Sequence, residues 1–446
     1  MQELAKKAGD NMIIKREKYL QEIINKKRNG LVKVITGLRR CGKSYLLFTL
    51  FKNHLQEKNI LERQVITFAF DNMEDIIKLD KYYPDEETMI FDSKKKNYKI
   101  NSKKFIKYID DLTCEAIDYY ILLDEIQLLD KFVFVLNGFL RHNNFDIYVT
   151  GSNSYMLSSD IMTEFRGRGD QIRVNPLSFK EFFDYKNIPF NDAYVEYQYF
   201  GGMPLVVLNN NDVEKKEYLK SLFNEIYIKD IVDRNDIQNI NSFETLLMIL
   251  SSSIGSYTNP TNIENKFKSE LKVSYHHDTI KKHIDFIEDS FLIREANKYD
   301  VKGKKYIGAN SKYYFTDLGL RNALINFRQD EPTHIMENII YNELINRGFS
   351  VDVGVIEISE KNEKGNYVRK QLETDFICNK VERKIYIQSA YSISNIDKLN
   401  QEKKSLVNIN DNYKKIIVVN DTIKNYVTEE GIEVVSLKSF LLDDII

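Results

Sequence analysis

Tryptophan is absent from the sequence, and cysteine is scarce. The three cysteines, Cys41, Cys114 and Cys378, lie far apart and lack the spacing of metal ligands. This pattern argues against a disulfide-stapled scaffold and favours a reducing compartment. The lack of tryptophan accompanies a general richness in Lys, Asn, Ile and Tyr, which we interpret as compositional bias rather than a functional signal.

Excess charge and long hydrophobic runs are also absent. The chain has 64 Lys and Arg residues and 66 Asp and Glu residues, so its formal net charge is −2. A net charge of this size gives no overall electrostatic attraction to nucleic acid. Any such binding must therefore come from local patches. No apolar run approaches the roughly 18 residues that span a membrane, and residues 1–10 are polar. We therefore expect a cytoplasmic protein without a membrane partner.

The hydrophobic residues that are present follow a clear pattern. They make up 43% of the 446 residues, which is enough to form buried hydrophobic cores. The length predicts about three domains. Helical patterns alternate with continuous apolar runs at 31–36, 64–70, 119–123, 145–150 and 171–174. This alternation predicts an α/β fold with a parallel sheet that helices cover on both faces.

The most informative motif follows the first of these runs and reads Gly-Leu-Arg-Arg-Cys-Gly-Lys-Ser at residues 37–44. A predicted helix begins directly after it, which is the context of a phosphate-binding P-loop, or Walker A motif. Glycines let backbone N–H groups turn toward phosphate oxygens, and the helix start adds a partial positive charge. The predicted nucleotide contacts are Gly37, Leu38, Arg39, Arg40, Cys41, Gly42, Lys43, Ser44 and Tyr45.

Two of these side chains have specific predicted roles. Lys43 is expected to contact the β- and γ-phosphates of ATP, and Ser44 is expected to bind Mg²⁺ through its hydroxyl. The buried strand at 119–123 ends in Asp124 and Glu125, as in a Walker B motif. Asp124 is expected to complete the Mg²⁺ site, and Glu125 to activate the water that attacks the γ-phosphate. The alternative interpretation of the two carboxylates is a solvated strand end.

Further candidates follow the strand predicted at 145–150. Ser152 and Asn153 could contact the γ-phosphate, or they could form a simple turn. Arg168 is the first candidate for an arginine finger that neutralises transition-state charge, and Arg166 is the second. Such a finger could act within one chain or on a neighbouring copy, so a homo-oligomer stays open. A salt-bridged loop is the alternative.

Residues 240–320 predict three helices, at 243–254, 262–267 and 275–287, and then a hairpin that turns at 300–303. This is the order of a winged helix, with Ser274 as the expected N-cap of the third helix. Basic side chains on that helix and on the hairpin could contact DNA phosphates. They are Lys281, Lys282, His283, Lys298, Lys302, Lys304, Lys305 and Lys312.

A solvated face is the alternative interpretation of these side chains, because the chain is rich in lysine throughout. No set of Arg and Asn side chains that would read bases is visible, so sequence-specific recognition is not supported.

Six short segments, spread over most of the chain, together resemble a known family. They are ITGLRRCGKS (35–44), ILLDEIQ (121–127), VTGSNSYML (149–157), FRGR with NPLSFKEF (165–168, 175–182), YFGGMP (199–204) and KYYFTDLGLRNAL (312–324). In these pieces the chain resembles the bacterial and archaeal AAA-type ATPases that carry an uncharacterised C-terminal domain. The first two are common among P-loop ATPases, whereas the last three are specific. The resemblance implies ATP binding, ATP hydrolysis, and a C-terminal half linked to DNA or to a protein partner.

The last part of the chain carries a separate pattern. Glu337 lies on a predicted helix and Asp375 on a predicted strand, and the next strand reads Gln388-Ser389-Ala390. Residues 334–446 resemble the restriction-endonuclease-like fold, whose active members use a helix Glu, an Asp, and then Glu-x-Lys on consecutive strands. In this chain Gln388 stands for the second carboxylate and Ala390 for the lysine. The resemblance therefore implies a degenerate centre of Glu337, Glu373, Asp375 and Gln388.

Replacements for the missing groups remain conceivable, since Lys403 or Lys404 could supply a lysine and Glu373 a carboxylate. We nevertheless favour an inactive fold that serves binding or assembly, because metal-dependent cleavage needs anionic ligands and a charge stabiliser.

Five parts are therefore expected, the last of them by resemblance. They are an N-terminal helical segment (1–30), an AAA-type P-loop NTPase core (31–177), a helical connector (178–237), a winged-helix-like domain (238–330) and an α/β restriction-endonuclease-like domain (331–446). The predicted function is an ATP- and Mg²⁺-dependent switch that acts on DNA or a protein partner. The alternatives are an ATP-dependent nuclease and a nucleotide-binding scaffold without turnover.

Overall fold

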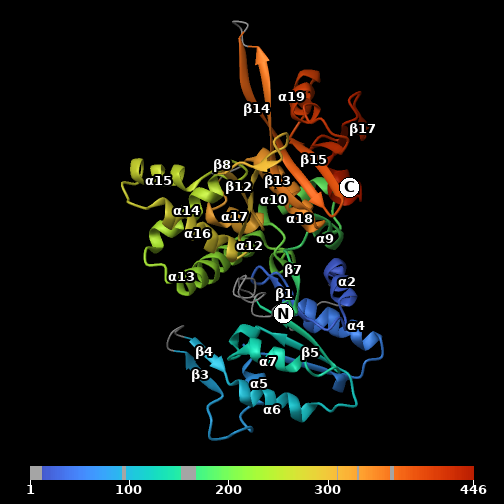
Figure 1. The fold of residues 1–446 in the computed structure, drawn as a ribbon, viewed down its shortest axis with the longest axis vertical. Helices are drawn as coiled ribbons and strands as arrows, with labels where there is room; N and C mark the ends of the chain where they lie inside the picture. The colour runs from blue at the N-terminus through green and yellow to red at the C-terminus, as the bar shows by residue number, and fades with distance from the viewer. Residues whose placement is uncertain (1–12, 93–96, 152–166, 309, 329–330, 362–365) are drawn as a thin grey trace. The chain divides into compact units, whose positions relative to one another are not determined.

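The computed structural model describes residues 13–92, 97–151, 167–308, 310–328, 331–361 and 366–446 (Figure 1). The chain divides into two compact units. The first unit comprises Met1–Pro176 with Asp289–Phe291, and the second unit comprises Leu177–Glu288 with Leu292–Ile446. The division lies beside the boundary predicted at 177, whereas the boundaries predicted at 237 and 330 fall inside the second unit.

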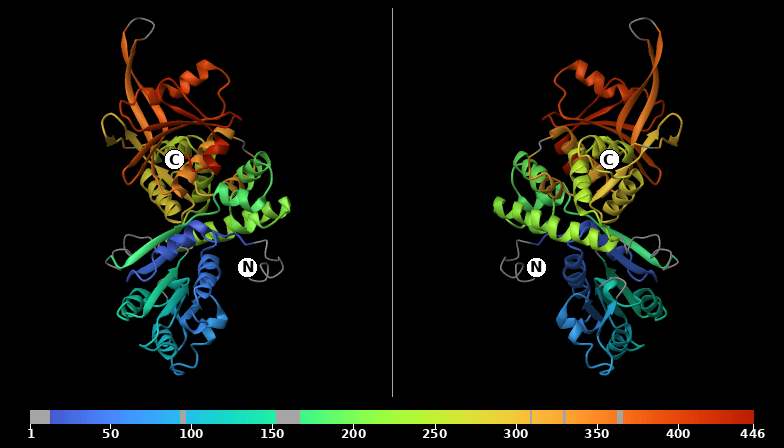
Figure 2. Two further views of the ribbon diagram at one scale, coloured as in Figure 1. Left: turned by 90° about the vertical axis from the view of Figure 1, so that its right-hand side faces the viewer. Right: turned by 90° about the vertical axis from the view of Figure 1, so that its left-hand side faces the viewer.

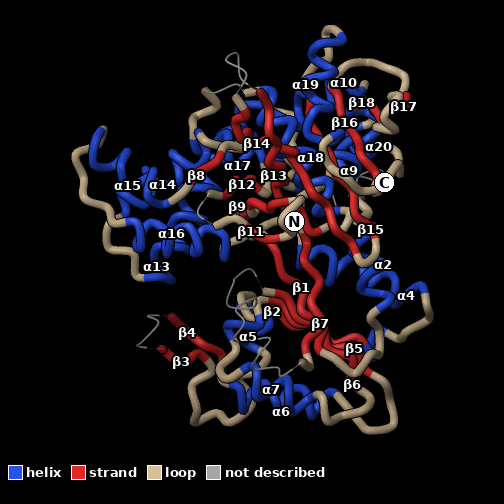
Figure 3. Tube along the Cα trace, turned by 45° about the horizontal axis from the view of Figure 1, so that its top comes forward, coloured by secondary structure: helices blue, strands red, loops and turns tan. Residues whose placement is uncertain are grey.

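The first unit is built on a five-stranded sheet in the order β2-β5-β6-β1-β7. All of its strand pairs are parallel, so the sheet has the fold of a P-loop NTPase (Figure 3). The strands are β1 (Val32–Gly37), β2 (Val65–Ala69), β5 (Tyr119–Asp124), β6 (Phe145–Thr150) and β7 (Gly169–Val174). Each falls on one of the apolar runs from which a strand was predicted, because strands covered on both faces need continuous apolar sequence.

Helices of the first unit surround this sheet and share a core with it. Phe68, Phe105, Ile121 and Leu136 are among the buried members of that core. The helices are α2 (Glu17–Asn25), α3 (Lys43–Tyr45), η2 (Leu46–Phe51), α4 (Lys52–Glu57), η3 (Glu62–Gln64), α5 (Met73–Ile77), α6 (Ser102–Leu112), η4 (Ile126–Leu128) and α7 (Phe132–Phe139). The polar stretch before α6 contains a separate hairpin of β3 (Met89–Asp92) and β4 (Asn97–Ile100).

The second unit begins with the predicted helical region. Its helices are α9 (Phe179–Lys186), α10 (Phe190–Phe200), α11 (Pro204–Val207), α12 (Asp212–Ser221), η6 (Leu222–Ile228) and α13 (Lys229–Asn235). Ser178 starts α9 as a capping box, in which its hydroxyl accepts the Glu181 N–H at 3.2 Å and the Glu181 carboxylate accepts the Ser178 N–H at 2.9 Å.

Three helices and a small sheet follow in the order predicted for residues 240–320. The helices are α14 (Ile240–Ser252), α15 (Pro260–Ser269) and α16 (His277–Asp289), and the strands β8 (Tyr257–Thr258), β9 (Ile293–Ala296) and β12 (Ser311–Phe315) pair in the order β8-β12-β9. The N-cap prediction at Ser274 is wrong, because α16 starts only at His277. The N–H of His277 instead donates to the Glu264 carboxylate of α15 at 3.2 Å.

The predicted hairpin is divided between two sheets. The two halves far from the turn are β9 and β12, which pair with each other. The two halves next to the turn are β10 (Lys298–Asp300) and β11 (Lys305–Tyr306), which also pair with each other. Strand β10 also pairs in parallel with β13 of the C-terminal sheet. A sheet edge offers unpaired N–H and C=O groups, and here the hairpin takes them up, so it ties this region to the C-terminal sheet.

The C-terminal part of the second unit has an eight-stranded sheet in the order β11-β10-β13-β14-β15-β16-β18-β17. Its further elements are α18 (Pro332–Asn346), β13 (Ser350–Lys361), β14 (Tyr367–Lys380), β15 (Arg383–Ala390), α19 (Ile396–Val407), β16 (Lys414–Val419), β17 (Tyr426–Val427), β18 (Glu433–Ser436) and α20 (Leu437–Leu442). Strands β13 and β14 extend together well beyond the rest of this sheet (Figure 2).

A buried carboxylate joins two of the sequence pieces within the second unit. Asp317, between β12 and α17 (Leu318–Leu324), accepts the Gly202 N–H at 2.7 Å and the Leu320 N–H at 3.0 Å. A Cβ atom at Gly201 would lie 2.4 Å from the Asp317 carboxylate, and one at Gly319 would lie 2.0 Å from the Phe200 carbonyl oxygen. The glycines of the YFGGMP and TDLG pieces therefore permit this close approach.

In the described part of the chain, every helix is too short or too polar to cross a lipid bilayer.

Candidate nucleotide-binding site

The P-loop leaves the carboxyl end of β1 in a tight curl. Gly37 has a φ of 140°, and a Cβ atom there would lie 2.0 Å from the carbonyl oxygen of Val174 on the neighbouring strand β7. Arg40 and Gly42 also have positive φ, of 63° and 99°. These left-handed positions turn the backbone back on itself before α3 begins at Lys43, as the strand–loop–helix prediction requires.

The ammonium group of Lys43 is buried and folds back over this loop. Its Nζ donates to the carbonyl oxygens of Gly37 at 3.0 Å and Leu38 at 3.1 Å. Both acceptors are neutral, so the positive charge of Lys43 is held by these two contacts without being cancelled. An incoming phosphate could replace these acceptors with stronger, charge-assisted hydrogen bonds.

A buried arginine from the N-terminal helical segment braces the same loop. Arg16, at the N-cap of α2, donates to the carbonyl oxygen of Cys41 at 3.3 Å and to that of Asn175 at 2.5 Å. Cys41 is itself buried, and its thiol lies 3.4 Å from the Val174 carbonyl oxygen. Sequence reasoning missed Arg16, because nothing local indicates that its partners lie 25 and 159 residues away.

Asp124 and Glu125 meet the end of the neighbouring strand β6 through one hydroxyl group. Thr150 donates a hydrogen bond from Oγ1 to the Asp124 carboxylate, and the same oxygen accepts the Glu125 N–H at 3.2 Å. Because β5 and β6 are adjacent and parallel, their carboxyl ends lie at one edge of the sheet. Thr150 was not predicted, although its place at the end of an apolar strand was a usable signal.

Glu125 is placed and tuned by its surroundings. Its backbone is left-handed, with a φ of 51° and a ψ of 47°, which is a strained conformation for a residue with a side chain. Burial and the nearby charge of Asp124 raise the pKa of Glu125, while the charge of Lys43 opposes the shift. The Gln127 side chain also donates to the Glu125 carboxylate. A carboxylate with a raised pKa is a better acceptor for the proton of an attacking water.

A third carboxylate lies at the same edge of the sheet. Asp71 follows β2, the neighbour of β5, and burial together with the charge of Asp124 raises the pKa of Asp71. The charge of Arg39 acts in the opposite direction. Asp71 was also missed, although it directly follows a predicted strand. The site therefore gathers acidic groups opposite the P-loop, as a cation-binding site requires.

The remaining nucleotide-site candidates are placed less favourably or lie outside the described residues. Ser44 and Tyr45 are half-buried at the start of the P-loop helix, and burial raises the pKa of Tyr45. Ser152, Asn153 and Arg166 fall in residues 152–166, which are outside the described residues.

Arg168 lies where strands β1 and β7 begin, at the end of the sheet away from the P-loop. Its carbonyl oxygen accepts the N–H of Val32 at 2.9 Å, at the start of β1. The P-loop leaves the other end of that strand, roughly 17 Å away. The prediction that Arg168 could act within its own chain is therefore wrong. A role in a neighbouring copy stays a prediction.

A second group of charged side chains lies inside the second unit, and we call it the carboxylate centre. It contains three of the residues expected from the endonuclease-like pattern, namely Glu337 on α18 with Glu373 and Asp375 on β14. The ammonium group of Lys312, from β12, lies 2.8 Å from Glu337 Oε1 and 2.7 Å from Glu373 Oε1. Tyr314, also on β12, donates to Glu337 at 2.5 Å.

The other members of the carboxylate centre are Asp375 and Gln388. Asp375 accepts the Ser389 N–H at 2.7 Å. Burial and the charge of Glu337 raise the pKa of Asp375 well above its usual range, while the charge of Lys312 opposes this shift. Gln388 accepts the Asp375 N–H at 3.4 Å and donates to Glu402 on α19 at 3.3 Å. The fourth predicted member is therefore present at the centre.

Several lysine predictions are wrong for reasons that the contacts explain. Lys312 was expected to contact DNA, but it is buried between two carboxylates. Lys403 and Lys404 do not complete the carboxylate centre, because they pair with Glu430 and Glu360.

His283 was also expected at the DNA surface. It is buried against Tyr275, with which it shares a hydrogen bond, and burial lowers the pKa of its imidazole. Six DNA-contact candidates remain. Five of them are exposed, namely Lys281, Lys282, Lys302, Lys304 and Lys305, whereas Lys298 is half-buried and donates to the Gln371 side chain at 3.3 Å.

Comparisons with known proteins match two parts of the chain. Residues 29–183 match the AAA domain family, and residues 191–331 match a domain of unknown function (DUF8612). An uncharacterised protein of Haemophilus influenzae is 32% identical over 437 residues, which cover 96% of this chain and 99% of that protein. An uncharacterised protein of Methanocaldococcus jannaschii is 29% identical over 452 residues, covering 98% of this chain and 89% of that protein.

Among solved structures, AMPPCP-bound DnaA from Aquifex aeolicus aligns with a TM-score of 0.29 and 12% identity, over 60% of this chain and 85% of that chain.

Proposed function

We propose that this chain, which belongs to one family with the Haemophilus influenzae protein and carries an AAA P-loop domain, is an ATP-hydrolysing switch. The observation that carries the proposal is the meeting of Lys43, Asp124 and Glu125 at one edge of the sheet. Lys43 and Asp124 both act on the charge of Glu125. This combination of a lysine at the P-loop and two carboxylates opposite it suits a phosphate ester with a bound metal ion.

The residues present fit both ATP and Mg²⁺. The P-loop offers a lysine held only through neutral acceptors in the contacts described, and loop geometry that permits backbone N–H groups to face phosphate oxygens. Ser44 and Asp124 would hold Mg²⁺ through oxygen atoms, its preferred ligands. When bound, Mg²⁺ would neutralise charge on the phosphate oxygens. Glu125 would accept a proton from the attacking water, and Thr150 would orient Asp124.

ATP turnover by the full chain tests this proposal. We expect Glu125→Gln to retain ATP binding and to lower turnover by about 10²-fold or more, because the proton acceptor is lost. Lys43→Ala is expected to abolish ATP binding as well. Lys58→Ala is the matched control, since Lys58 is an exposed lysine at the end of the same helix. Turnover unchanged by both substitutions at the site would overturn the proposal.

We propose that ATP binding in the first unit changes how the second unit binds DNA or a protein partner. Three helices and a strand-paired hairpin in the order of a winged helix support an interaction with DNA, with exposed Lys281 and Lys282 on α16. Affinity for duplex DNA should fall as salt rises, and reversing both charges with Glu should reduce both the affinity and the salt dependence. If the double variant binds DNA as the parent does, a protein partner becomes the better assignment.

The contacts of the carboxylate centre argue against a nuclease. Lys312 pairs with Glu337 and Glu373, two groups that a metal ion would need. Divalent-metal-dependent DNA cutting that Asp375→Ala abolishes would establish the nuclease instead. A scaffold without turnover would show ATP binding with no release of phosphate.

A further inference from the structure

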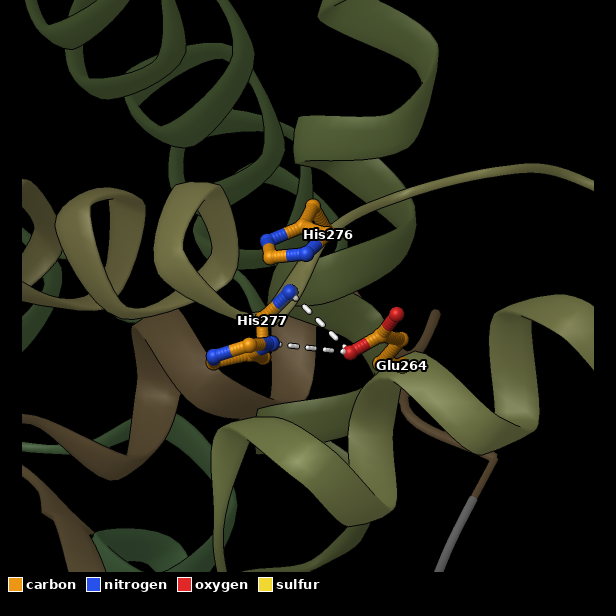
Figure 4. A group of neighbouring side chains, drawn as sticks. All are labelled: Glu264, His276 and His277. Atoms are coloured by element: carbon orange, nitrogen blue, oxygen red, sulfur yellow. Dashed lines mark hydrogen bonds and ion pairs between the residues drawn. The ribbon is translucent and has the colours of Figure 1, made fainter.

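Two adjacent histidines and a glutamate come together where α15 and α16 meet. His276 ends the connection between these helices, His277 is the first residue of α16, and Glu264 lies in the middle of α15 (Figure 4). Each of the three offers one ligand atom, and these atoms all lie within 4.8 Å of one another. Among the described residues, this is the one group of three His, Cys, Asp or Glu side chains that meets so closely.

Glu264 is held in place by its neighbours. Its Oε1 pairs with Lys268 at 2.6 Å, and its Oε2 lies 3.2 Å from both the backbone N and the Nδ1 of His277. A carboxylate that is already fixed by its contacts loses little freedom when it binds a cation.

The two imidazole rings are accessible from solvent. The His276 side chain is 61% exposed and the His277 side chain 47%, and the ring centroids are 4.3 Å apart. Asp278 adds a second carboxylate, 3.5 Å from Nδ1 of His276 and 3.3 Å from Nε2 of His277. A cation can therefore reach both rings from water.

We propose that Glu264, His276 and His277 bind a divalent transition-metal ion of the Zn²⁺ class. Two imidazole nitrogens and one carboxylate oxygen are a donor set typical of Zn²⁺, with a fourth position left for water or Asp278. Mg²⁺ and Ca²⁺ prefer oxygen ligands alone and should bind more weakly. The ion would tie α15 to the first turn of α16, the helix that carries Lys281 and Lys282.

Metal binding to the full chain, freed of metal by a chelator and without nucleotide, tests the proposal. Isothermal titration with Zn²⁺ should show one high-affinity ion per chain, and Co²⁺ should give the visible absorption of a four-coordinate nitrogen and oxygen site. Because imidazole must be neutral to bind a metal, the affinity should fall on acidification. His277→Gln and Glu264→Gln should each weaken Zn²⁺ binding roughly tenfold or more.

Two further variants keep the test decisive. Glu264→Gln also changes the contact that receives the first N–H of α16, so reduced binding could reflect a damaged helix. His276→Gln avoids this, because the described contacts of His276 run to Asp278 and to the His277 ring, and it too should weaken binding. His142→Gln is the matched control, an exposed histidine stacked on Phe145 in the first unit. A chain that binds no Zn²⁺, or three site variants that bind as the parent does, would overturn the proposal.

Discussion

The nucleotide site and the carboxylate centre both bring a buried lysine near carboxylates, yet they use the lysine charge in opposite ways. Lys43 donates to two neutral carbonyl oxygens of its own loop. Lys312 donates to the carboxylates of Glu337 and Glu373. A charge held by neutral groups remains available to a ligand, whereas a charge in an ion pair is already neutralised. The proposed chemistry therefore falls at the P-loop, whereas Lys312 ties α18, β12 and β14 of the second unit together through its ion pairs.

The electrostatics of the two sites follow this division. Burial alone would lower the pKa of Lys312, but Glu337, Asp375 and Glu373 outweigh burial and raise it. The carboxylates therefore favour the charged form of Lys312. At the nucleotide site burial instead raises the pKa of a carboxylate, that of Glu125.

The largest expected effect is on stability at the carboxylate centre. Lys312→Met leaves the buried Glu337 and the half-buried Glu373 without their cation, which should cost about 3–5 kcal/mol in the free energy of unfolding of the second unit. Hydrogen exchange of the amides in α18 and β14 would localise the loss. Lys305→Met, an exposed lysine of β11, is the control.

A metal ion should restore part of that loss. Mn²⁺ is expected to raise the unfolding temperature of the Lys312→Met variant by more than that of the parent, because only in the variant can the ion take the place of the ammonium group. An unfolding temperature equal to that of the parent, without metal, would mean that the ion pairs contribute nothing to stability.

A smaller effect is expected at Asp317, where backbone N–H groups hold a buried carboxylate. Burial raises the pKa of Asp317 to about 6, against the hydrogen bonds that lower it. The unfolded value is about 4, so the folded protein takes up this proton more readily. This group therefore favours folding most at low pH, and about 2 kcal/mol is lost as the pH rises from about 4 to about 6.

Asp317→Asn isolates this contribution. The pH dependence of unfolding by denaturant should become flatter between those limits in the variant than in the parent. Identical slopes in both proteins would show that Asp317 does not titrate in this range.

At the nucleotide site, Thr150→Val should lower ATP turnover by roughly tenfold while leaving the fold intact. The variant keeps the shape of the side chain but removes the hydroxyl that links Asp124 to the N–H of Glu125. Steady-state phosphate release at saturating ATP measures the effect. Thr113→Val is a suitable control, because its hydroxyl bonds only locally, to the Ile109 carbonyl oxygen. Parent-like turnover in Thr150→Val would exclude a role for this hydroxyl.

The smallest effect completes the comparison of the two lysines. Without nucleotide, Lys43→Met should change the free energy of unfolding by only about 1 kcal/mol, because it removes hydrogen bonds to neutral acceptors. Chemical denaturation of the first unit measures this change beside that of Lys312→Met. If the two substitutions cost equal stability, the two sites do not differ in the way that their contacts indicate.

Local sequence was sufficient for the five strands of the parallel sheet in the first unit and for the order of its motifs. Apolar runs predicted β1, β2, β5, β6 and β7, because strands that are covered on both faces leave a continuous hydrophobic signature. Asp71 and Thr150 were missed although they follow or end such strands. Both are polar residues at the carboxyl end of a predicted parallel strand, and that position was the signal that could have identified them.

Other residues gave no signal that sequence reasoning could use. Arg16 and Lys312 are buried through partners distant in the chain, and each looked like an ordinary basic residue in a polar segment. His283 looked like a surface residue of α16, although its ring faces the core beside Tyr275. The periodicity of a helix indicates which face is apolar, but not which polar side chain that face accepts.

The sequence by itself determined the P-loop, the pair of carboxylates after β5 and the succession of folded parts, because these depend on residues close together in the chain. Only the tertiary structure decided what each charge does. It placed Lys312 against Glu337 and Glu373, Arg168 at the far edge of the sheet from the P-loop, and His276 beside Glu264. The physical reason is that the interaction of a buried charge depends on its neighbours in space, and sheet pairing brings those neighbours from distant parts of the chain.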